Sequence, residues 1–167
     1  GDFIVTLGAL NGSLGGSEYL RTIHGKIQGP IPHLNLELEM GIQELCLDAI
    51  KKGIIKSAHD LSDGGLAVNL SESLIQSKAG LGAKLDVVRK LHNSELLFGE
   101  CQSVIIVTLE ESALYELILL AQNLDMHTQT IGRVNESNSL VINDQIDISR
   151  TKLENAYFNS LEKIMTQ

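Results

Sequence analysis

Apolar residues recur every three to four positions in several parts of the chain, which is the spacing of an amphipathic helix. The clearest series is Leu34, Leu38, Ile42, Leu45, Cys46, Ala49 and Ile50, and Gly53 follows it as a stop signal. Shorter series predict helices that start at a Ser17 cap and that cover 66–74, 94–98, 112–122 and 153–164. Each of these helices is expected to turn one face to a core.

Short segments rich in β-formers lie between these helices and predict strands at 3–7, 54–57, 84–88, 104–109, 128–134, 140–142 and 146–148. The run 104–109 is apolar throughout and predicts a central strand buried on both faces. The polar residues 135–138 predict a hairpin from 128–134 to 140–142, and Asn143-Asp144 predicts a turn toward 146–148. Helices and strands alternate, but the hairpins disfavour a purely parallel sheet. We therefore expect an α+β fold with a mixed sheet flanked by helices.

Composition narrows the class of protein. The 167 residues are enough for one domain over 1–167, and the net charge of −8 and 4% aromatic content argue against a nucleic-acid partner. No apolar run is long enough for a membrane span, and two cysteines at an undistinguished spacing favour the reducing cytoplasm. The chain opens on Gly1-Asp2-Phe3 without an initiator Met, so we expect it to be part of a longer polypeptide.

The segment 57–66 concentrates polar chemistry where a predicted strand leads into a helix. It holds His59, Asp60, Asp63, Gly64 and Gly65. Unpaired backbone N–H groups at a helix start suit a phosphate, and an aspartate there suits the Mg²⁺ that would accompany it. The simpler alternative is that Asp63 caps the helix and His59 packs in the interior.

The segment 97–103 places Glu100, Gln102 and Ser103 just before the apolar strand. Their carboxylate, amide and hydroxyl suit a sugar hydroxyl or a metal, and the alternative is a loop that satisfies its own backbone. The glycine-rich loop 12–16 lacks the Lys-Ser/Thr ending of a P-loop. Neither cysteine has a partner at zinc-ligand spacing, so no structural metal site is expected, and the lack of a nucleophile elbow argues against a hydrolytic triad.

Three segments occur together: LGGSEY at 14–19, SAHDLSDGGLA at 57–67 and LFGECQS at 97–103. In this order they resemble the phosphoribosylformylglycinamidine synthases, in the last of the domains that this family shares with aminoimidazole ribonucleotide synthetase. The resemblance covers essentially the whole chain, and the middle segment is its most specific part. It implies the C-terminal domain type of the aminoimidazole ribonucleotide synthetase superfamily, here as the C-terminal fragment of a multidomain synthetase.

The resemblance implies an ATP- and Mg²⁺-dependent carbon–nitrogen ligase of purine biosynthesis. In that reaction the amide oxygen of formylglycinamide ribonucleotide is phosphorylated, and ammonia from glutamine displaces phosphate to give formylglycinamidine ribonucleotide. The catalytic histidines and most ATP contacts of the family belong to other domains. The isolated domain is therefore expected to be inactive.

The resemblance also implies that the family's fold consists of two pseudo-equivalent halves. Some site residues of the other half have counterparts in this chain. Asp60 falls where that half places a Mg²⁺-binding aspartate, and Glu100 and Gln102 fall on its substrate-binding Glu-Ser-Gln run. Here Cys101 stands where Ser is usual, and Val104 replaces an Arg that commonly follows. An arginine would bind phosphate through two hydrogen bonds. We therefore expect a mainly structural domain with a vestigial nucleotide or substrate site, and no cofactor that is certain to bind within it.

Two other classes stay open: a free-standing Mg²⁺-nucleotide-binding regulatory module, and a relative of selenophosphate synthetase or of the hydrogenase maturation protein. The resemblance implies two partners, namely the remaining domains of the synthetase and a glutaminase subunit or domain. Phe3 and Val5 are expected to pack on the missing domains, or to drive self-association of the fragment.

Overall fold

The computed structural model describes residues 1–77, 80–88, 91–160 and 165. Seven strands form one sheet in the order β2-β4-β1-β5-β3-β6-β7. The strands are β1 (Phe3–Leu7), β2 (Ser57–Asp60), β3 (Gly82–Leu85), β4 (Ile105–Leu109), β5 (Thr128–Asn135), β6 (Ser139–Ile142) and β7 (Ile146–Ser149). Only β3 and β6 pair in parallel, and the other neighbours are antiparallel. The predicted mixed sheet is confirmed.

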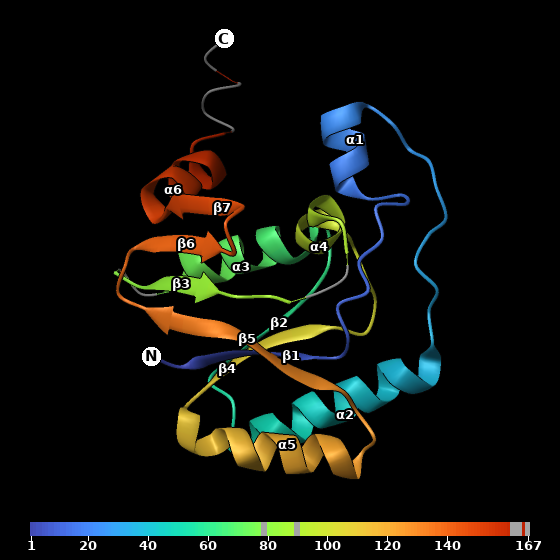
Figure 1. Ribbon diagram of the computed structural model, residues 1–167, viewed down its shortest axis with the longest axis vertical. Helices are drawn as coiled ribbons and strands as arrows, with labels where there is room; N and C mark the ends of the chain where they lie inside the picture. The colour runs from blue at the N-terminus through green and yellow to red at the C-terminus, as the bar shows by residue number, and fades with distance from the viewer. Residues whose placement is uncertain (78–79, 89–90, 161–164, 166–167) are drawn as a thin grey trace.

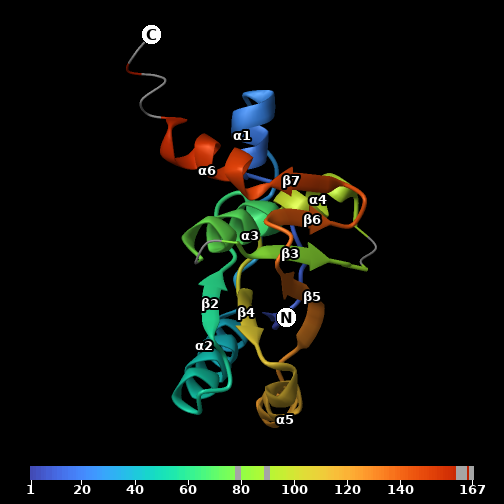
Figure 2. The same ribbon diagram turned by 90° about the vertical axis from the view of Figure 1, so that its left-hand side faces the viewer.

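Helices cover both faces of this sheet (Figures 1 and 2). They are α1 (Glu18–His24), α2 (Leu36–Lys51), α3 (Gly65–Gln76), α4 (Asn93–Phe98), α5 (Leu114–Asn123) and α6 (Arg150–Phe158), with a short 3₁₀ turn at Glu111–Ala113. α3, α4 and α6 pack on one face, and α2 and α5 pack on the other. The α+β class is therefore confirmed. No helix among the described residues is both long and apolar enough to cross a membrane.

The core consists of two clusters, one on each face of the sheet. Along β4, Ile106 belongs to the cluster under α3, and Val107 and Leu109 belong to the cluster under α2 and α5. This alternation follows from the two-residue period of a strand. The predicted burial of this strand on both faces is confirmed, although β4 lies only one strand from the β2 edge of the sheet.

The strand predicted over 54–57 lies further along the chain. Ile54 is buried in the α2 cluster as part of the connection, and the strand that pairs with β4 is Ser57–Asp60. The prediction was displaced because the apolar residues fill the core, whereas the paired residues form an exposed sheet edge. His59 and Asp60 consequently lie within β2, before the glycine turn rather than inside it.

The hairpin predicted between 128–134 and 140–142 is wrong. β3 lies between β5 and β6, antiparallel to the first and parallel to the second. The insertion buries Leu85 beside Leu140 and Ile142, so a non-local apolar contact outweighs the local turn. The turn after Ile142 does form a hairpin, because β6 and β7 pair antiparallel.

The final helix begins at Arg150, three residues before the predicted start, and its continuous described part runs to Phe158. Leu153 packs against the core, but Tyr157 and Phe158 are 51% and 62% exposed. Two positions of the predicted apolar stripe, Leu161 and Ile164, lie outside the described residues.

The expectation that Val5 awaits a partner is also wrong. β1 lies between β4 and β5 in the middle of the sheet, and Val5 is only 1% exposed. Phe3 is partly buried, with the Arg133 guanidinium 3.8 Å above its ring. The chain therefore covers Val5 completely and Phe3 in part.

Candidate functional site

Three connections meet at one end of the sheet: the β1–α1 loop, the β2–α3 turn and the α4–β4 segment. Ser13 and Glu100 join two of them through reciprocal backbone hydrogen bonds of 3.1 and 2.9 Å. Ser17 caps α1, as predicted, and its Oγ accepts a hydrogen bond from the Leu20 N–H. The Gly64 N–H donates to the Glu100 carboxylate, so the sequence segments 57–66 and 97–103 are brought together, as the resemblance requires.

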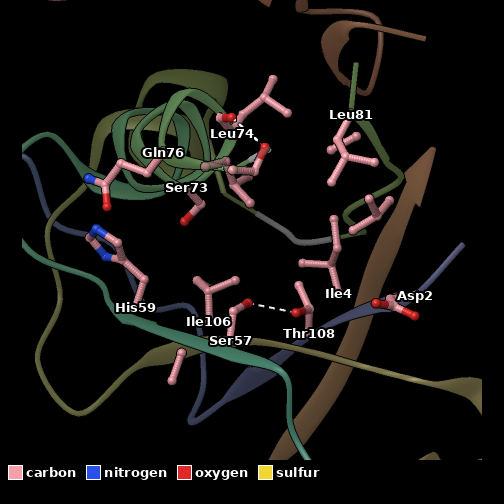
Figure 3. A pocket seen from close by; sticks show the side chains of 15 residues that line it. Asp2, Ile4, Ser57, His59, Ser73, Leu74, Gln76, Leu81, Ile106 and Thr108 are labelled. Atoms are coloured by element: carbon pink, nitrogen blue, oxygen red, sulfur yellow. Dashed lines mark hydrogen bonds between the residues drawn. The ribbon is translucent and has the colours of Figure 1, made fainter. Parts of the chain in front are cut away.

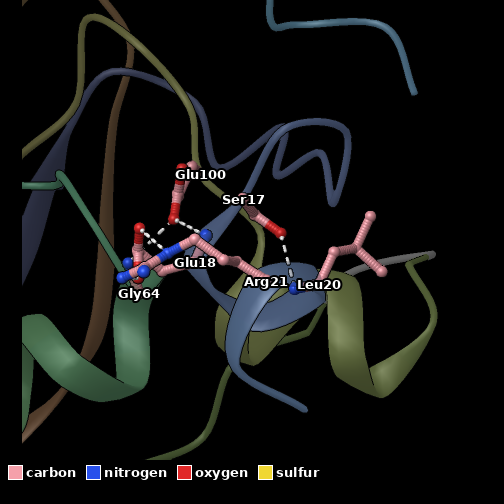
Figure 4. A network of polar contacts seen from close by, with 6 residues as sticks. All are labelled: Ser17, Glu18, Leu20, Arg21, Gly64 and Glu100. Atoms are coloured by element: carbon pink, nitrogen blue, oxygen red, sulfur yellow. Dashed lines mark hydrogen bonds and ion pairs between the residues drawn. The ribbon is translucent and has the colours of Figure 1, made fainter. Parts of the chain in front are cut away.

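The Glu100 carboxylate is the centre of this meeting point (Figure 4). Its Oε1 accepts hydrogen bonds from the backbone N–H of Glu18 at 2.8 Å and of Gly64 at 3.0 Å. These N–H groups lie at the starts of α1 and α3, where backbone donors have no partner within the helix and a negative charge is favourable. One carboxylate oxygen of the protein therefore ties both loops to the sheet.

Glycines allow the three segments to approach this closely. A Cβ at Gly65 would lie 2.7 Å from the Gly99 carbonyl oxygen, and a Cβ at Gly99 would lie 2.8 Å from the Gly12 carbonyl carbon. Gly64 and Gly65 also have positive φ angles of 82° and 68°. The paired glycines, interpreted in the sequence as a phosphate turn, are required here for chain packing.

The aspartates Asp60 and Asp63 are both exposed at this turn. Gly64 is the N-cap of α3 and makes no side-chain capping bond, so the alternative in which Asp63 caps the helix is wrong. No group of three or more His, Cys, Asp or Glu side chains able to hold a metal occurs among the described residues. Magnesium typically takes one or two carboxylates and completes its shell with phosphates and water. The two aspartates fit Mg²⁺ in that donor type.

Arg21 is a cation close enough to this turn to be influenced by the charge of Asp63, and it forms an exposed ion pair with Glu18. The hydrogen bond from Arg21 lowers the pKa of Glu18. The bond to Glu18, with a smaller contribution from the charge of Asp63, raises the pKa of Arg21. The guanidinium is therefore a positive group beside the turn that is already engaged by a carboxylate.

His59 is separated from the Glu100 network. Its ring faces α3, with Nδ1 2.7 Å from Asn69 Nδ2 and Nε2 3.4 Å from a Glu72 carboxylate oxygen. Successive strand residues point to opposite faces of a sheet, so Asp60 leaves the strand on the other side. His59 thus packs against a helix with its side chain 26% exposed, and so it does not lie in the interior as the simpler sequence interpretation had it.

Sequence reasoning missed Asn69, which joins β2 to α3. The residue is 2% exposed, and its Nδ2 donates a 2.7 Å hydrogen bond to the Asp60 carbonyl oxygen. Its side chain therefore fixes the strand end that carries Asp60. The available signal was a polar residue three positions after Leu66, on the inward face of the predicted helix.

The side chains of the other residues in the segment 97–103 lie in different surroundings. Gln102 is exposed, whereas Ser103 has φ 57° and donates a 2.6 Å hydrogen bond to Glu39 on α2. Cys101 is buried, and burial raises the pKa of its thiol more than a hydrogen bond to the Asn11 backbone lowers it. A protonated, buried thiol is a poor nucleophile. Glu100 and Gln102 are thus the polar side chains of this segment directed toward the loops or solvent.

A cavity of about 370 Å³ lies between α3 and the sheet, beside the Ser57 end of β2 (Figure 3). Its floor is apolar and includes Ile4, Leu74 and Ile106, and its rim includes His59 and the hydrogen-bonded pair Ser57 and Thr108. The cavity borders the Ser57 end of β2, whereas the glycine turn follows the Asp60 end. It is therefore separate from the Glu100 network.

This fold is found in solved structures of known enzymes. Thermotoga maritima PurL complexed with FGAR matches with a TM-score of 0.75 at 19% identity, over 92% of this chain and 28% of that one. A thiamine-monophosphate kinase from Stenotrophomonas maltophilia matches with a TM-score of 0.57 at 20% identity, over 86% and 50%. The chain thus has the architecture of the aminoimidazole ribonucleotide synthetase-like domains, which alone does not fix an activity.

Sequence comparison gives the family. Residues 1–145 match the family described as AIR synthase related protein, C-terminal domain, and the chain belongs to this family. Phosphoribosylformylglycinamidine synthase subunit PurL of Alkaliphilus metalliredigens is 47% identical over 110 residues, or 66% of this chain and 15% of the relative. The Bartonella bacilliformis subunit is 36% identical over 165 residues, or 99% and 22%. The resemblance seen in the sequence is confirmed, and the chain spans only 15% to 22% of these relatives.

Proposed function

We propose that this chain is the C-terminal domain of a phosphoribosylformylglycinamidine synthase. The observation that carries the proposal is the match to a PurL subunit over 99% of the chain. The whole enzyme would phosphorylate the amide of formylglycinamide ribonucleotide with ATP and replace the phosphate with ammonia from glutamine. Its other domains and a glutaminase subunit or domain would be the partners, and the cytoplasm would be the compartment.

ATP and Mg²⁺ are proposed as cofactors of the whole enzyme. Support comes from the Thermotoga maritima PurL structures, which include complexes with ATP, ADP and AMPPCP. In this chain Asp60 and Asp63 would hold the metal, whose charge would neutralise phosphate oxygens. The nucleotide or substrate would contact Gly64, Gly65, Glu100 and Gln102, whereas His59, whose ring contacts Asn69 and Glu72 of α3, would lie beside this set rather than within it.

Within this domain the site is proposed to be mainly structural. The support is the Glu100 carboxylate, since Oε1 already accepts the two backbone N–H groups that would otherwise face an incoming anion. An approaching phosphate would have to compete with this internal carboxylate. The chain therefore supports the rest of the synthase through its fold and contributes no catalytic group.

The direct test is an assay of the purified chain with ATP, Mg²⁺, formylglycinamide ribonucleotide and ammonia. We expect no phosphate release above the background without enzyme. Sustained turnover by this chain alone would contradict the structural role.

Titration calorimetry with Mg²⁺-ADP separates this proposal from the regulatory module. We expect no binding in the micromolar range. Micromolar binding that Asp60→Ala abolishes, and that the control Asp86→Ala at another exposed carboxylate leaves unchanged, would favour the module.

A further inference from the structure

The cavity between α3 and the sheet lies at the far end of α3 from the Glu100 network. Its lining residues on α3 run from Leu70 to Gln76, whereas the Glu100 carboxylate binds the N–H of Gly64 at the helix start. The volume of about 370 Å³ falls in the range of pockets that bind small organic molecules. The cavity is therefore a second place in this chain with room for a ligand.

Small side chains create this space. Protein interiors are close-packed, so larger apolar side chains at these positions would fill the gap between helix and sheet. The small residues that line the cavity come from both layers, namely Ser57 and Ala58 on β2, Ala83 on β3 and Ser73 on α3. The sequence thus leaves the helix and the sheet apart at this end.

Both ends of α3 are fixed, which holds the helix at its distance from the sheet. Glu100 binds the start of the helix. At the other end the Arg150 guanidinium, which is buried, donates hydrogen bonds to the carbonyl oxygens of Ile75 at 3.2 Å and of Ser77 at 2.7 Å. The helix cannot settle further onto the sheet without disturbing these contacts. The cavity is therefore preformed, and binding there requires little rearrangement.

The lining combines the apolar floor with polar groups that have no other task. Ser73 and Gln76 extend from α3 into the space above the sheet (Figure 3). Within the described part of the chain, no hydrogen bond joins either side chain to another residue. The hydroxyls of Ser57 and Thr108, in contrast, bond each other at 2.6 Å. A ligand would thus meet an unused hydroxyl and an unused amide beside an apolar surface.

Charge decides which class of ligand fits. Among the described residues that line the cavity there is no lysine or arginine. Lys56, close by in sequence, is engaged at 3.0 Å by both Asp2 and Glu110. The Nε2 atom of His59 lies 3.4 Å from a Glu72 carboxylate oxygen. A phosphate or carboxylate would lose its water here without gaining a cationic partner, so an anion is disfavoured.

We propose that this cavity binds a small uncharged ring compound that carries one or two hydrogen-bonding groups. The ring lies on the apolar floor, and the polar groups bond to Ser73 and Gln76. The walls come from α3 and from strands β1 to β5 of this chain, so a neighbouring domain of the synthase is not needed to complete the site. The proposal goes beyond the proposed function and does not depend on it.

Nuclear magnetic resonance of the ¹⁵N-labelled chain tests the proposal, with indole as the probe. Indole is an uncharged ring compound with one N–H donor. We expect saturable shifts of the amides of Ser73, Gln76 and Ala83 with a Kd below about 1 mM, and no saturable shift at Gln43 on the opposite face. Indole-3-carboxylate should bind at least about 10-fold more weakly because its charge has no cationic partner. No saturable shift up to about 5 mM indole, or equal affinity for both probes, would overturn the proposal.

Variants that fill the cavity locate the site. Ser73→Phe fills it from the helix and Ala83→Leu fills it from the sheet, and each should weaken indole binding by at least about 10-fold. The matched control Gln43→Phe, at an exposed position of α2, should leave the affinity unchanged. Circular dichroism verifies that each variant folds, and either filling variant suffices if the other does not. Unchanged affinity in a folded filling variant, or equal weakening by Gln43→Phe, would show that indole binds elsewhere and would overturn the proposal.

Discussion

Helices α2 and α3 each cover one face of the same sheet, but they differ in how completely their apolar side chains are buried. On α3 the apolar side chains Leu66, Leu70, Leu74 and Ile75 are all at most 6% exposed, and the helix carries no exposed large hydrophobic residue. On the outer side of α2, away from the sheet, four large apolar side chains are at least 51% exposed, namely Leu36, Met40, Leu47 and Ile50. One helix completes its burial within the chain, and the other does not.

The polar contacts of the two helices also differ, because α3 is held by more contacts with other parts of the chain than α2. α3 is fixed at its start by Glu100, which is 36 residues from Gly64, and along its inner face by the hydrogen bond from Asn69 to the end of the preceding strand, β2. Asn35 caps α2 locally, and the hydrogen bond from Ser103 to Glu39 is the long-range side-chain bond described for it. α3 therefore organises the loop cluster inside the chain, whereas α2 presents an apolar surface on its outer side.

The largest expected effect separates the two sides of α2. Leu45→Ala, at a residue 0% exposed, should lower the free energy of unfolding by about 3 to 5 kcal/mol through lost burial and a residual cavity. Leu47→Ala, the same substitution two positions away, should cost less than about 1 kcal/mol. Urea denaturation measures the free energy of unfolding of both variants. Similar losses would refute the distinction between the inner and outer sides.

Removing the anchor of α3 should have the next largest effect. Glu100→Ala leaves the N–H groups of Glu18 and Gly64 without their acceptor and should cost about 2 to 3 kcal/mol of unfolding free energy. Glu136→Ala, at an exposed carboxylate in the β5–β6 turn, is the control and should be nearly neutral. Increased amide hydrogen exchange at Gly64 would locate the loss, and unchanged exchange there would show that Glu100 does not tie the loops.

The inner polar contact of α3 should contribute less. Asn69→Leu conserves volume but removes the hydrogen bond to the Asp60 carbonyl, and it should cost about 1 to 2 kcal/mol. The control is Ser71→Ala, since the Ser71 hydroxyl bonds only within its own helix. Chemical denaturation compares the two variants. Equal stability of both would mean that Asn69 does not fix the end of β2.

The smallest expected effect is the change in folding stability with pH that arises from one buried cysteine in each core cluster. Burial raises the pKa of the thiols of both Cys46 and Cys101. A raised folded-state pKa means that stability is fully present below the unfolded value of about 9 and declines as pH rises toward the folded value. Each thiol should contribute at most about 1.4 kcal/mol per pH unit in that window.

The free energies of unfolding of the wild type and of Cys101→Ala at pH 7 and pH 10 measure the contribution of the Cys101 thiol. The variant should lose less stability over the interval than the wild type. Native protein should also react slowly with a thiol reagent at pH 8. Rapid labelling of Cys101 would show that the core near the loop cluster opens readily.

Much of the fold could be predicted because its determinants are local. The periodicity over 34–50, the Ser17 cap and the apolar run of β4 each depend on neighbouring residues, and the structure has all three. The β5–β6 hairpin failed because β3, distant in sequence, buries Leu85 between the two strands. The shift of β2 has a similar cause, since only the pairing with β4 decides which residues form the edge.

The candidate site was predictable in composition but not in arrangement. The sequence alone determined which polar groups are available, where the glycines permit tight turns, and which family the chain belongs to, because these depend on residue identity and order. Only the tertiary structure decided that Glu100 turns inward onto two backbone donors, that His59 faces α3 and that Val5 is covered. Those outcomes depend on which distant segments share space, and no local pattern encodes that choice.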